Sequence, residues 1–466
     1  MSEHILFLTG KLAERSLRQV LEEMQPTDFT YEVYELGIRV AALMTAEMIG
    51  RRLKSTFDAH RIMVPGRCRG NLDDLSGQFG LPVERGPEEL KDLAVFFGGQ
   101  QEPPDLSRYE VEIFAEIVDA PELSVEAIVK RALEYHGDGA DVIDLGCLPD
   151  TPFPHLSDSV RALKELGFKV SVDSLTPDDL ITGGQAGADF ILSLNEQTLW
   201  VADEVESTPV LIPRDPSDPD SLYRVLDKLE CANRRYIADS ILDPIHFGFA
   251  DSLVRYHQLR TRAPNAEIMM GIGNLTELTE ADTVGINAML MGLVSEMRIN
   301  HVLVTQVSPH CRTVIREVDR SRRIMYRARN DNGLPKQVDD GLTALHERKP
   351  FPYAGPEIRE LAAAIRDPSF RIQVSEEGIH IYNRDGLAVA ENPFDLFPSL
   401  NVDSDGGHAF YLGVELARAQ IAWQLGKRYV QDEELRWGCI VTREDTDISR
   451  YHAPGTTMNN SKSKRR

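Results

Sequence analysis

Acidic and amide side chains follow most of the short apolar runs in the middle of this sequence, at the point where each run ends. A single aspartate in such a place is usually a helix cap or a turn residue. An aspartate or asparagine recurs in this place after five of eight runs, however, and this predicts one site built from several segments. The positions are Asp144, Asp173, Asn195 with Ser193 before it, Asp239 followed by Asp243, Asn274, and, after the last run, Gln306, His310 and Arg312.

These residue types suit the recognition of a flat, polar heterocycle. Carboxylates and amides can pair with the donor-rich edge of a ring system such as a 2-amino-4-oxopteridine, and a positive group opposite them can hold a diphosphate. The set does not resemble a Ser-His-Asp triad, a clustered histidine metal site or a dinucleotide fingerprint. We therefore predict no metal ligands among these residues. The glycine-rich stretch Gly183–Gly187 is interpreted as a helix end.

The apolar runs are the strands that must position these side chains. Alternation of short β-rich runs with helical segments predicts an α/β fold, and eight strands favour a closed (β/α)8 TIM barrel over an open doubly wound sheet. In a closed barrel, the residues after the strands meet at one rim. The predicted strands are Val111–Val118, Asp141–Leu145, Lys169–Val172, Phe190–Leu194, Pro209–Pro213, Arg235–Ala238, Ile268–Ile272 and His301–Thr305.

The barrel is flanked by two further regions. Strands at Ile5–Leu8, Tyr31–Leu36 and Arg61–Val64, with helices at Leu12–Met24 and Val40–Leu53, predict an N-terminal α/β domain over residues 1–105. The barrel itself is assigned to residues 106–332, and a linker with a short helix to residues 333–368. A hairpin of Phe370–Val374 and Ile379–Tyr382, followed by a helix at Ala409–Leu425, predicts a small C-terminal α+β domain over residues 369–452. Residues 453–466 are expected to be a disordered tail.

Composition limits the classes of partner and the compartment. The 466 residues carry a formal net charge of −23, which disfavours nucleic acid and anionic membranes as partners. We find no apolar stretch near the roughly 20 residues that a membrane-spanning helix needs. The five cysteines are scattered without paired spacing, so a reducing compartment is expected, most simply the cytoplasm.

Several segments resemble the pterin-binding barrels, the family of dihydropteroate synthases and methyltetrahydrofolate:corrinoid methyltransferases. Ala140–Gly146 is similar to the Asp-containing strand-two motif of that family, and Val172-Asp173-Ser174 to its strand-three motif. Gly187–Ile191 resembles the segment that precedes the pterin-binding asparagine. Leu242–Phe249 resembles the synthase Asp-Pro-Gly-x-Gly-Phe-Gly segment. The resemblance covers about half of the chain and implies a pterin-binding TIM barrel.

The resemblance implies roles for particular residues. Asp173, Asn195 (or Ser193, given a small offset) and Asp243 would bind the pterin, with Asp144 supporting the pocket. Asn274, after strand seven, matches the asparagine of the corrinoid methyltransferases and would also face the pterin. His310 and Arg312, after strand eight, would act on a diphosphate as the catalytic residues, together with a magnesium ion that accompanies it.

The same resemblance leaves three functions open. The first is a transferase of folate or tetrahydromethanopterin biosynthesis that condenses a dihydropterin hydroxymethyl diphosphate with an arylamine. The second is a methylpterin-dependent methyltransferase, which would require a corrinoid protein partner and is supported by Asn274. The third is a non-catalytic pterin-binding protein.

The departures from the synthases motivate the third function. Strand one ends in Val118-Asp119-Ala120-Pro121-Glu122 where synthases have Asn-x-Thr-Pro-Asp, and strand seven lacks their lysine. Only Asp119 and Glu122 could substitute after strand one. The layout with flanking domains resembles synthase-related proteins of organisms that use tetrahydromethanopterin as a one-carbon carrier. Barrels of this family often form homodimers, so this assembly is carried over as an expectation.

Overall fold

A computed structural model describes residues 3–87, 90–98, 104–148, 151–402 and 404–441, and the expected disordered tail lies outside them. The chain divides into two compact units. The first contains Met1–Arg108 and Tyr326–Val338, and the second contains Tyr109–Met325 and Asp339–Arg466. None of the helices in the described ranges combines the length and apolarity that crossing a bilayer requires.

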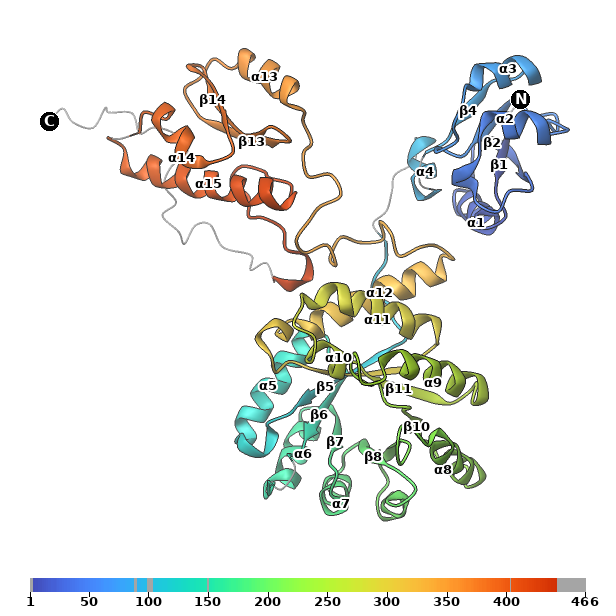
Figure 1. Cartoon of the computed structure of the whole chain (residues 1–466), viewed down its shortest axis with the longest axis vertical. Helices are drawn as coiled ribbons and strands as arrows, with labels where there is room; N and C mark the ends of the chain where they lie inside the picture. The colour runs from blue at the N-terminus through green and yellow to red at the C-terminus, as the bar shows by residue number, and fades with distance from the viewer. Residues whose placement is uncertain (1–2, 88–89, 99–103, 149–150, 403, 442–466) are drawn as a thin grey trace. The chain divides into compact units, whose positions relative to one another are not determined.

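The first unit is built on a parallel four-stranded sheet in the order β2-β1-β3-β4 (Figure 1). Ile5 and Phe7 of β1 pack into one apolar cluster and Leu6 and Leu8 into another, because successive side chains of a strand point to opposite faces. Both faces of the sheet are thus covered. The strands are β1 Glu3–Thr9, β2 Phe29–Glu35, β3 Arg61–Val64 and β4 Val83–Arg85, and the α-helices are α1 Glu14–Glu23, α2 Ala46–Arg52, α3 Leu72–Phe79 and α4 Leu93–Phe96.

One helix of this unit begins later than the sequence predicts. The prediction placed it at Val40–Leu53, whereas α2 begins at Ala46. The Thr45 hydroxyl accepts a hydrogen bond from the Met48 N–H and so caps the helix there. The preceding residues form only a short 3-10 turn, Ala41–Leu43.

The second unit contains a closed barrel of eight parallel strands, which confirms the predicted fold class (Figure 1). The closed order is β10-β11-β12-β5-β6-β7-β8-β9, with β9 paired to β10. The sixth strand is shorter than predicted, since only two residues join its neighbours. The strands are β5 Glu112–Ile117, β6 Val142–Gly146, β7 Lys169–Asp173, β8 Phe190–Leu194, β9 Thr208–Leu211, β10 Ile237–Ala238, β11 Glu267–Gly271 and β12 His301–Thr305.

Helices surround the barrel and bury its outer surface. A 3-10 segment, Leu199–Glu204, takes the place of an α-helix between β8 and β9. The expected helix end at Gly183–Gly187 is confirmed, because α7 ends at Gln185. The helices are α5 Val125–Asp138, α6 Leu156–Glu165, α7 Pro177–Gln185, α8 Pro219–Cys231, α9 Phe249–Arg262, α10 Gly273–Thr276, α11 Thr283–Glu296 and α12 Val314–Asn330.

The barrel interior is filled rather than open. Phe114, Val142, Phe190, Met269 and their neighbours form an apolar layer inside it, and the Phe114 and Phe190 rings meet edge to face at 4.9 Å. This layer forms the floor beneath the carboxyl ends of the strands, where ligands of such barrels bind.

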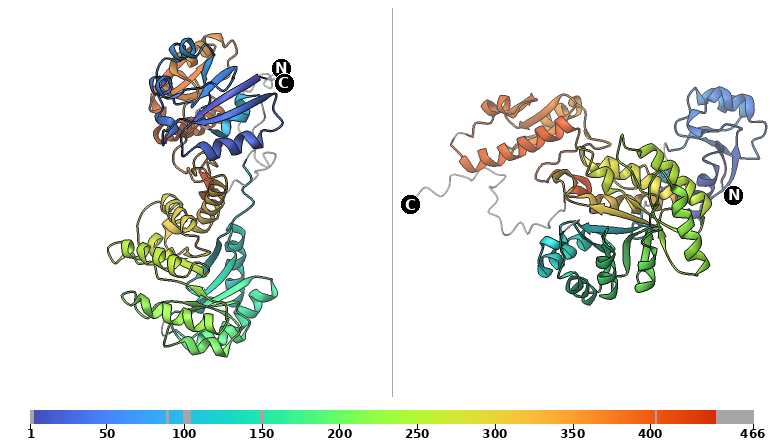
Figure 2. Two further views of the ribbon diagram at one scale, coloured as in Figure 1. Left: turned by 90° about the vertical axis from the view of Figure 1, so that its right-hand side faces the viewer. Right: turned by 60° about the horizontal axis from the view of Figure 1, so that its bottom comes forward.

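The C-terminal region is a three-stranded antiparallel sheet with a long helix packed along it (Figure 2). The predicted hairpin is present as β13 Arg371–Ser375 and β14 Gly378–Asn383, and the predicted helix as α15 Gly406–Leu425. A third strand, β15 Gly386–Ala390, was not predicted. The remaining α-helices here are α13 Gly355–Ala364 and α14 Pro393–Leu396.

Candidate functional site

Three neighbouring strands bring acidic side chains to the carboxyl end of the barrel interior. The strand register pairs Glu116 of β5 with Asp144 of β6. Phe114 and Val142, two residues earlier on these strands, belong to the apolar interior layer. Since strand side chains repeat with a period of two, Glu116 and Asp144 also face the interior, one level above that layer. Asp173 ends β7 and completes the group.

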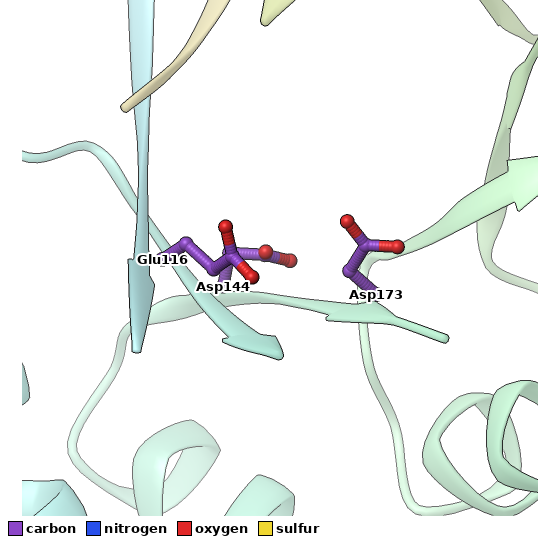
Figure 3. A group of neighbouring side chains, drawn as sticks. All are labelled: Glu116, Asp144 and Asp173. Carbon is purple, nitrogen blue, oxygen red and sulfur yellow. The ribbon is translucent and has the colours of Figure 1, made fainter. Parts of the chain in front are cut away.

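We call Glu116, Asp144 and Asp173 the acidic cluster (Figure 3). One carboxylate oxygen from each residue lies within 4.8 Å of the other two. Asp144 is fully buried, and its Oδ1 accepts a hydrogen bond of 2.5 Å from the Ser171 hydroxyl. Its Oδ2 is also buried but has no hydrogen-bond partner among the described residues.

The surroundings of the acidic cluster favour its protonated forms. Burial raises the pKa of Asp144 to about 7, although the Ser171 hydrogen bond opposes the shift. Burial and the charge of Asp144 raise the pKa of Glu116 to about 8. Burial and the neighbouring carboxylates raise the pKa of Asp173 well above its usual range. In the described part of the chain, no lysine or arginine is among the charges that shift these three groups, so a donor-rich or cationic ligand would be strongly favoured.

A fourth carboxylate, Asp239, follows β10 and acts electrostatically on Asp173. Its Oδ1 accepts hydrogen bonds from the Tyr256 hydroxyl at 2.6 Å and from the Ile241 N–H at 2.7 Å. Burial raises the pKa of Asp239 to about 6 despite these donors. Ile241 adopts a left-handed backbone with φ of +63°, an unfavourable conformation for a β-branched residue that the bond to Asp239 helps to hold.

The structure gives Asp243, the aspartate of the Asp-Pro motif, a place in the loop that follows β10. The Asp243 Oδ2 forms an ion pair of 2.6 Å with Nη2 of Arg255, and both side chains are largely buried. The Asp243 N–H donates to the Ser252 hydroxyl at 2.8 Å. Arg255 also donates to the carbonyl oxygens of Ser240 and Ile241. Asp243 therefore braces the loop that presents Asp239.

The predicted amide and hydroxyl positions lie at or just after the carboxyl ends of β8 and β11. Ser193 stands where the register between β8 and β9 shifts. Asn195, just after β8, accepts the Gln197 N–H on its Oδ1 at 2.9 Å and so forms a local turn. Asn274, on the short helix α10, is exposed and donates from Nδ2 to the Leu242 carbonyl at 3.0 Å. This bond joins the loops that follow β10 and β11.

The two predicted catalytic residues share the loop between β12 and α12. His310 Nε2 lies 3.2 Å from the carbonyl oxygen of Thr276, which places the proton on Nε2 when the ring is neutral. Arg312 is exposed at the end of the 3-10 turn Pro309–Cys311, just before α12. Both residues are thus on the same rim as the four carboxylates.

Two members of this site were not chosen from the sequence. Glu116 lies within a strand rather than after it, and the signal that could have found it is its spacing of two from Phe114. Asp239 was noticed after strand six, but the Asp-Pro motif at Asp243 was preferred. The sequence also predicted no metal ligands, because the strand-end residues do not resemble a clustered histidine metal site. Carboxylate oxygens are nevertheless the ligands that hard divalent cations prefer.

Comparison with known proteins finds similarity over both units. Residues 3–88 match the model of a family of unknown function, DUF6513. An uncharacterized protein of Methanocaldococcus jannaschii is 24% identical over 92% of this chain and 98% of its own length.

Solved structures similar to this chain include dihydropteroate synthases, which align with about half of it. The Yersinia pestis enzyme with a pterine-sulfa conjugate is 16% identical, covers 48% of this chain and 96% of its own, and has a TM-score of 0.38. The Xanthomonas albilineans enzyme in complex with 7,8-dihydropteroate is 18% identical over 48% of this chain and 94% of its own, with a TM-score of 0.37. The Thermus thermophilus enzyme in complex with 6HMPPP is 20% identical over 46% of this chain and 92% of its own, with a TM-score of 0.35.

Proposed function

We propose that the barrel is a pterin-binding transferase that condenses a dihydropterin hydroxymethyl diphosphate with an arylamine. The observation that carries this proposal is that Asp144, Asp173 and Asp239 come together with Glu116, largely shielded from solvent, at the carboxyl ends of the barrel strands. The 2-amino-4-oxopteridine edge offers several N–H donors, and carboxylates that accept them form strong, charge-assisted hydrogen bonds. The sequence resemblance to pterin-binding barrels leads to the same ligand.

Within this proposal, Asp173 and Asp239 accept the pterin N–H groups, and Asp144 supports them from below. Asp239 takes the role that the sequence assigned to Asp243, because the Asp243 carboxylate is bound to Arg255. Ser193, Asn195 and Asn274 line the same rim and remain candidates for contact with the edge of the ring.

The chemistry needs positioning and charge stabilisation rather than a covalent intermediate. The arylamine nitrogen attacks the methylene carbon, a C–N bond forms, and the C–O bond to the diphosphate breaks. The amine then loses a proton, and the diphosphate leaves with the electron pair. His310 and Arg312 would stabilise the departing diphosphate from the rim, with Mg²⁺ bound to it as part of the substrate.

Apolar side chains on the rim suit the second, aromatic substrate. Leu175, Phe247 and Val307 are strongly exposed and follow β7, β10 and β12. They therefore stand at the carboxyl ends of the strands, on the side where the polar groups converge. A 4-aminobenzoate or a ribofuranosylaminobenzene derivative would bury this apolar surface. We assign the product to the biosynthesis of folate or of tetrahydromethanopterin.

Calorimetric titration with 6-hydroxymethyl-7,8-dihydropterin diphosphate, with and without Mg²⁺, tests the pterin site. A pyrophosphate-release assay with each arylamine then tests the reaction. We expect binding and release by the wild type, pterin binding weakened about 10–100-fold in Asp173→Asn, and no change in Asp178→Asn, an exposed aspartate on α7. Binding without release would instead favour methyl transfer or binding alone, and a requirement for a corrinoid protein would select methyl transfer. Absence of pterin binding would overturn the proposal.

A further inference from the structure

The acidic cluster has the dimensions of a cation site. Two oxygens bound to one ion can be separated by at most twice the metal–oxygen distance, which is roughly 4.2 Å for Mg²⁺ and about 4.6–5.2 Å for Ca²⁺. The oxygens offered by Glu116, Asp144 and Asp173 lie within 4.8 Å of one another. A cation between them would require little movement of the side chains.

The buried Oδ2 of Asp144 points independently to a ligand. Asp144 is fully buried, yet this oxygen has no hydrogen-bond partner among the described residues, which is costly for a carboxylate. In Figure 3 the Asp144 carboxylate extends into the space between Glu116 and Asp173. A cation in that space would satisfy this oxygen.

Neighbouring hydroxyl groups support such a site from outside. The Ser171 hydroxyl donates to Oδ1 of Asp144, which fixes the orientation of the carboxylate as outer partners do around bound metals. Thr305 is paired with Glu116 in the strand register, and its buried hydroxyl has no partner among the described residues. The Thr305 hydroxyl could accept a hydrogen bond from a water bound to the cation, or donate one to it.

Gly146 makes room for one of the three carboxylates. A Cβ at this position would lie 2.5 Å from Oε1 of Glu116 and 3.1 Å from the Val118 Cα. Any side chain would therefore push the Glu116 carboxylate away from its place over β6. The glycine keeps Glu116 beside Asp144.

We propose that Glu116, Asp144 and Asp173 bind a hard divalent cation of the Mg²⁺, Mn²⁺ and Ca²⁺ class at the floor of the barrel mouth. The three carboxylates occupy one side of the cation and leave its outer side to water or substrate. This site differs from a magnesium ion carried in by a diphosphate, because its ligands all come from strands of the barrel. It goes beyond the proposed function, since it requires no pterin.

The test is titration of the full-length protein with Mn²⁺, followed by electron paramagnetic resonance of the free ion. We expect one Mn²⁺ per chain, displaced by Mg²⁺ or Ca²⁺. Ser171→Ala removes a residue that hydrogen-bonds a metal ligand, so it should weaken Mn²⁺ binding by roughly 10–100-fold. Glu116→Gln and Asp144→Asn each remove a ligand itself and should weaken Mn²⁺ binding by more than that factor. The matched control is Glu165→Gln, an exposed glutamate at the end of α6, which should bind as the wild type does.

Gly146→Ala tests whether the position of the Glu116 carboxylate matters, because this variant retains all three carboxylates but moves that of Glu116. It should weaken Mn²⁺ binding as Glu116→Gln does, while near-ultraviolet circular dichroism reports whether each variant is folded. If Mn²⁺ does not bind at about 1 mM, or if folded Glu116→Gln and Asp144→Asn bind it as the wild type does, the proposed site is wrong.

The pterin titration, repeated in EDTA, distinguishes the two proposals. Mn²⁺ binding that is sensitive to Glu116, without pterin binding, supports the cation site and overturns only the proposed function. Pterin binding in EDTA by a protein that takes up no Mn²⁺ overturns only the cation site.

Discussion

The hydroxyl of Tyr256 on α9 donates a hydrogen bond of 2.6 Å to Oδ1 of Asp239, the carboxylate that follows β10. Tyr256 is fully buried and Asp239 is partly buried. The bond favours the ionised form of the aspartate against the burial that raises its pKa to about 6. A helix outside the barrel therefore controls the charge of a residue at its mouth.

Tyr256→Phe should lower stability more at pH 8 than at pH 5. Asp239 is ionised above its pKa of about 6, and a buried charge that loses a donor costs about 1–3 kcal/mol. Near pH 5 the aspartate is protonated and the donor matters less. We expect the thermal midpoint to fall by about 2–4 °C per kcal/mol, measured by calorimetry at both pH values.

The matched control is Tyr382→Phe, which removes a hydroxyl that donates to the neutral amide oxygen of Gln373 at 2.9 Å. Its effect on the midpoint should be the same at both pH values. A Tyr256→Phe variant that also showed no pH dependence would mean that the hydroxyl does not act on the charge of Asp239.

Asp173→Asn and Asp243→Asn should separate binding from stability. Asp173→Asn removes a carboxyl whose pKa is raised by burial and by neighbouring carboxylates, so the midpoint at pH 8 should stay constant or rise. Pterin affinity should fall about 10–100-fold, as expected for a lost charge-assisted hydrogen bond. Asp243→Asn should instead lower the midpoint, because it leaves the largely buried Arg255 without its ion-pair partner.

The outcome for Asp243 bears on what the sequence could predict. The strand-end aspartates and the Asp-Pro motif were visible, and β8 and β12 have their predicted bounds. Arg255, twelve residues further along, binds Asp243 because α9 folds back toward the loop. No spacing in the sequence indicates this contact. If Asp243→Asn abolishes pterin binding without changing stability, the assignment made from the motif is right and the role given to Asp239 is wrong.

Two other differences between prediction and structure have physical reasons. Glu116 was missed because only residues after the strand ends were inspected, whereas the last inward-facing residue within a strand also reaches the mouth. The strand β15 was missed because Gly386, Ala388 and Ala390 are small and give weak apolar alternation. Its pairing with β14 decides its structure instead.

A second group of charges, at the opposite end of the barrel, should make stability depend on pH. His301 is buried, with Nε2 3.1 Å from Glu267 and Nδ1 3.3 Å from Glu112. Burial alone would lower the pKa of His301, but the two carboxylates raise it overall. Interaction with His301, together with Lys169 for Glu112 and Arg235 for Glu267, lowers the pKa of both glutamates to about 2.

The signs of these shifts define a pH window. The contribution of the glutamates is present above their ordinary pKa of 4.5 and is lost as the pH falls toward 2. The contribution of His301 is present below its ordinary pKa of 6.5 and is lost as the pH rises through its raised value. Stability from this group is therefore greatest between pH 4.5 and 6.5.

His301→Gln should flatten the loss of stability above pH 6.5, since glutamine does not titrate. Thermal midpoints measured from pH 3 to pH 9 would show this, with His136→Gln on α5 as the control. His136 contacts the backbone carbonyl of Ala140 at 3.1 Å and the Phe168 ring, so its replacement removes a histidine from a helix without touching the His301 group. Equal slopes for His301→Gln and the wild type would show that His301 is uncharged throughout.

Arg322 should be among the residues that contribute most to the stability of the barrel. It is buried on α12, donates to the carbonyl oxygens of Val111 and Gly139, and pairs with Asp141 and Asp319. Arg322→Met would remove the ion-pair partner of these two carboxylates and should lower the free energy of unfolding by about 3–5 kcal/mol. The thermal midpoint should fall by about 2–4 °C per kcal/mol, whereas Arg161→Met, at an exposed position on α6, should change it little. Similar midpoints for the two variants would mean that α12 is held to the barrel by its apolar face alone.

Phe247→Ala should weaken the binding of the aromatic substrate and leave the pterin unaffected. Phe247, in the loop after β10, is 81% exposed, so truncating its side chain should cost the free protein little stability. Burial of a phenylalanine side chain against a ligand contributes about 1.5–3 kcal/mol, which corresponds to roughly a 10–100-fold increase in KM for the arylamine. Phe394→Ala, at an 84% exposed position in the C-terminal region, is the matched control. Steady-state kinetics with each substrate varied in turn would measure both constants, and an unchanged KM for the arylamine would place the aromatic substrate away from this part of the rim.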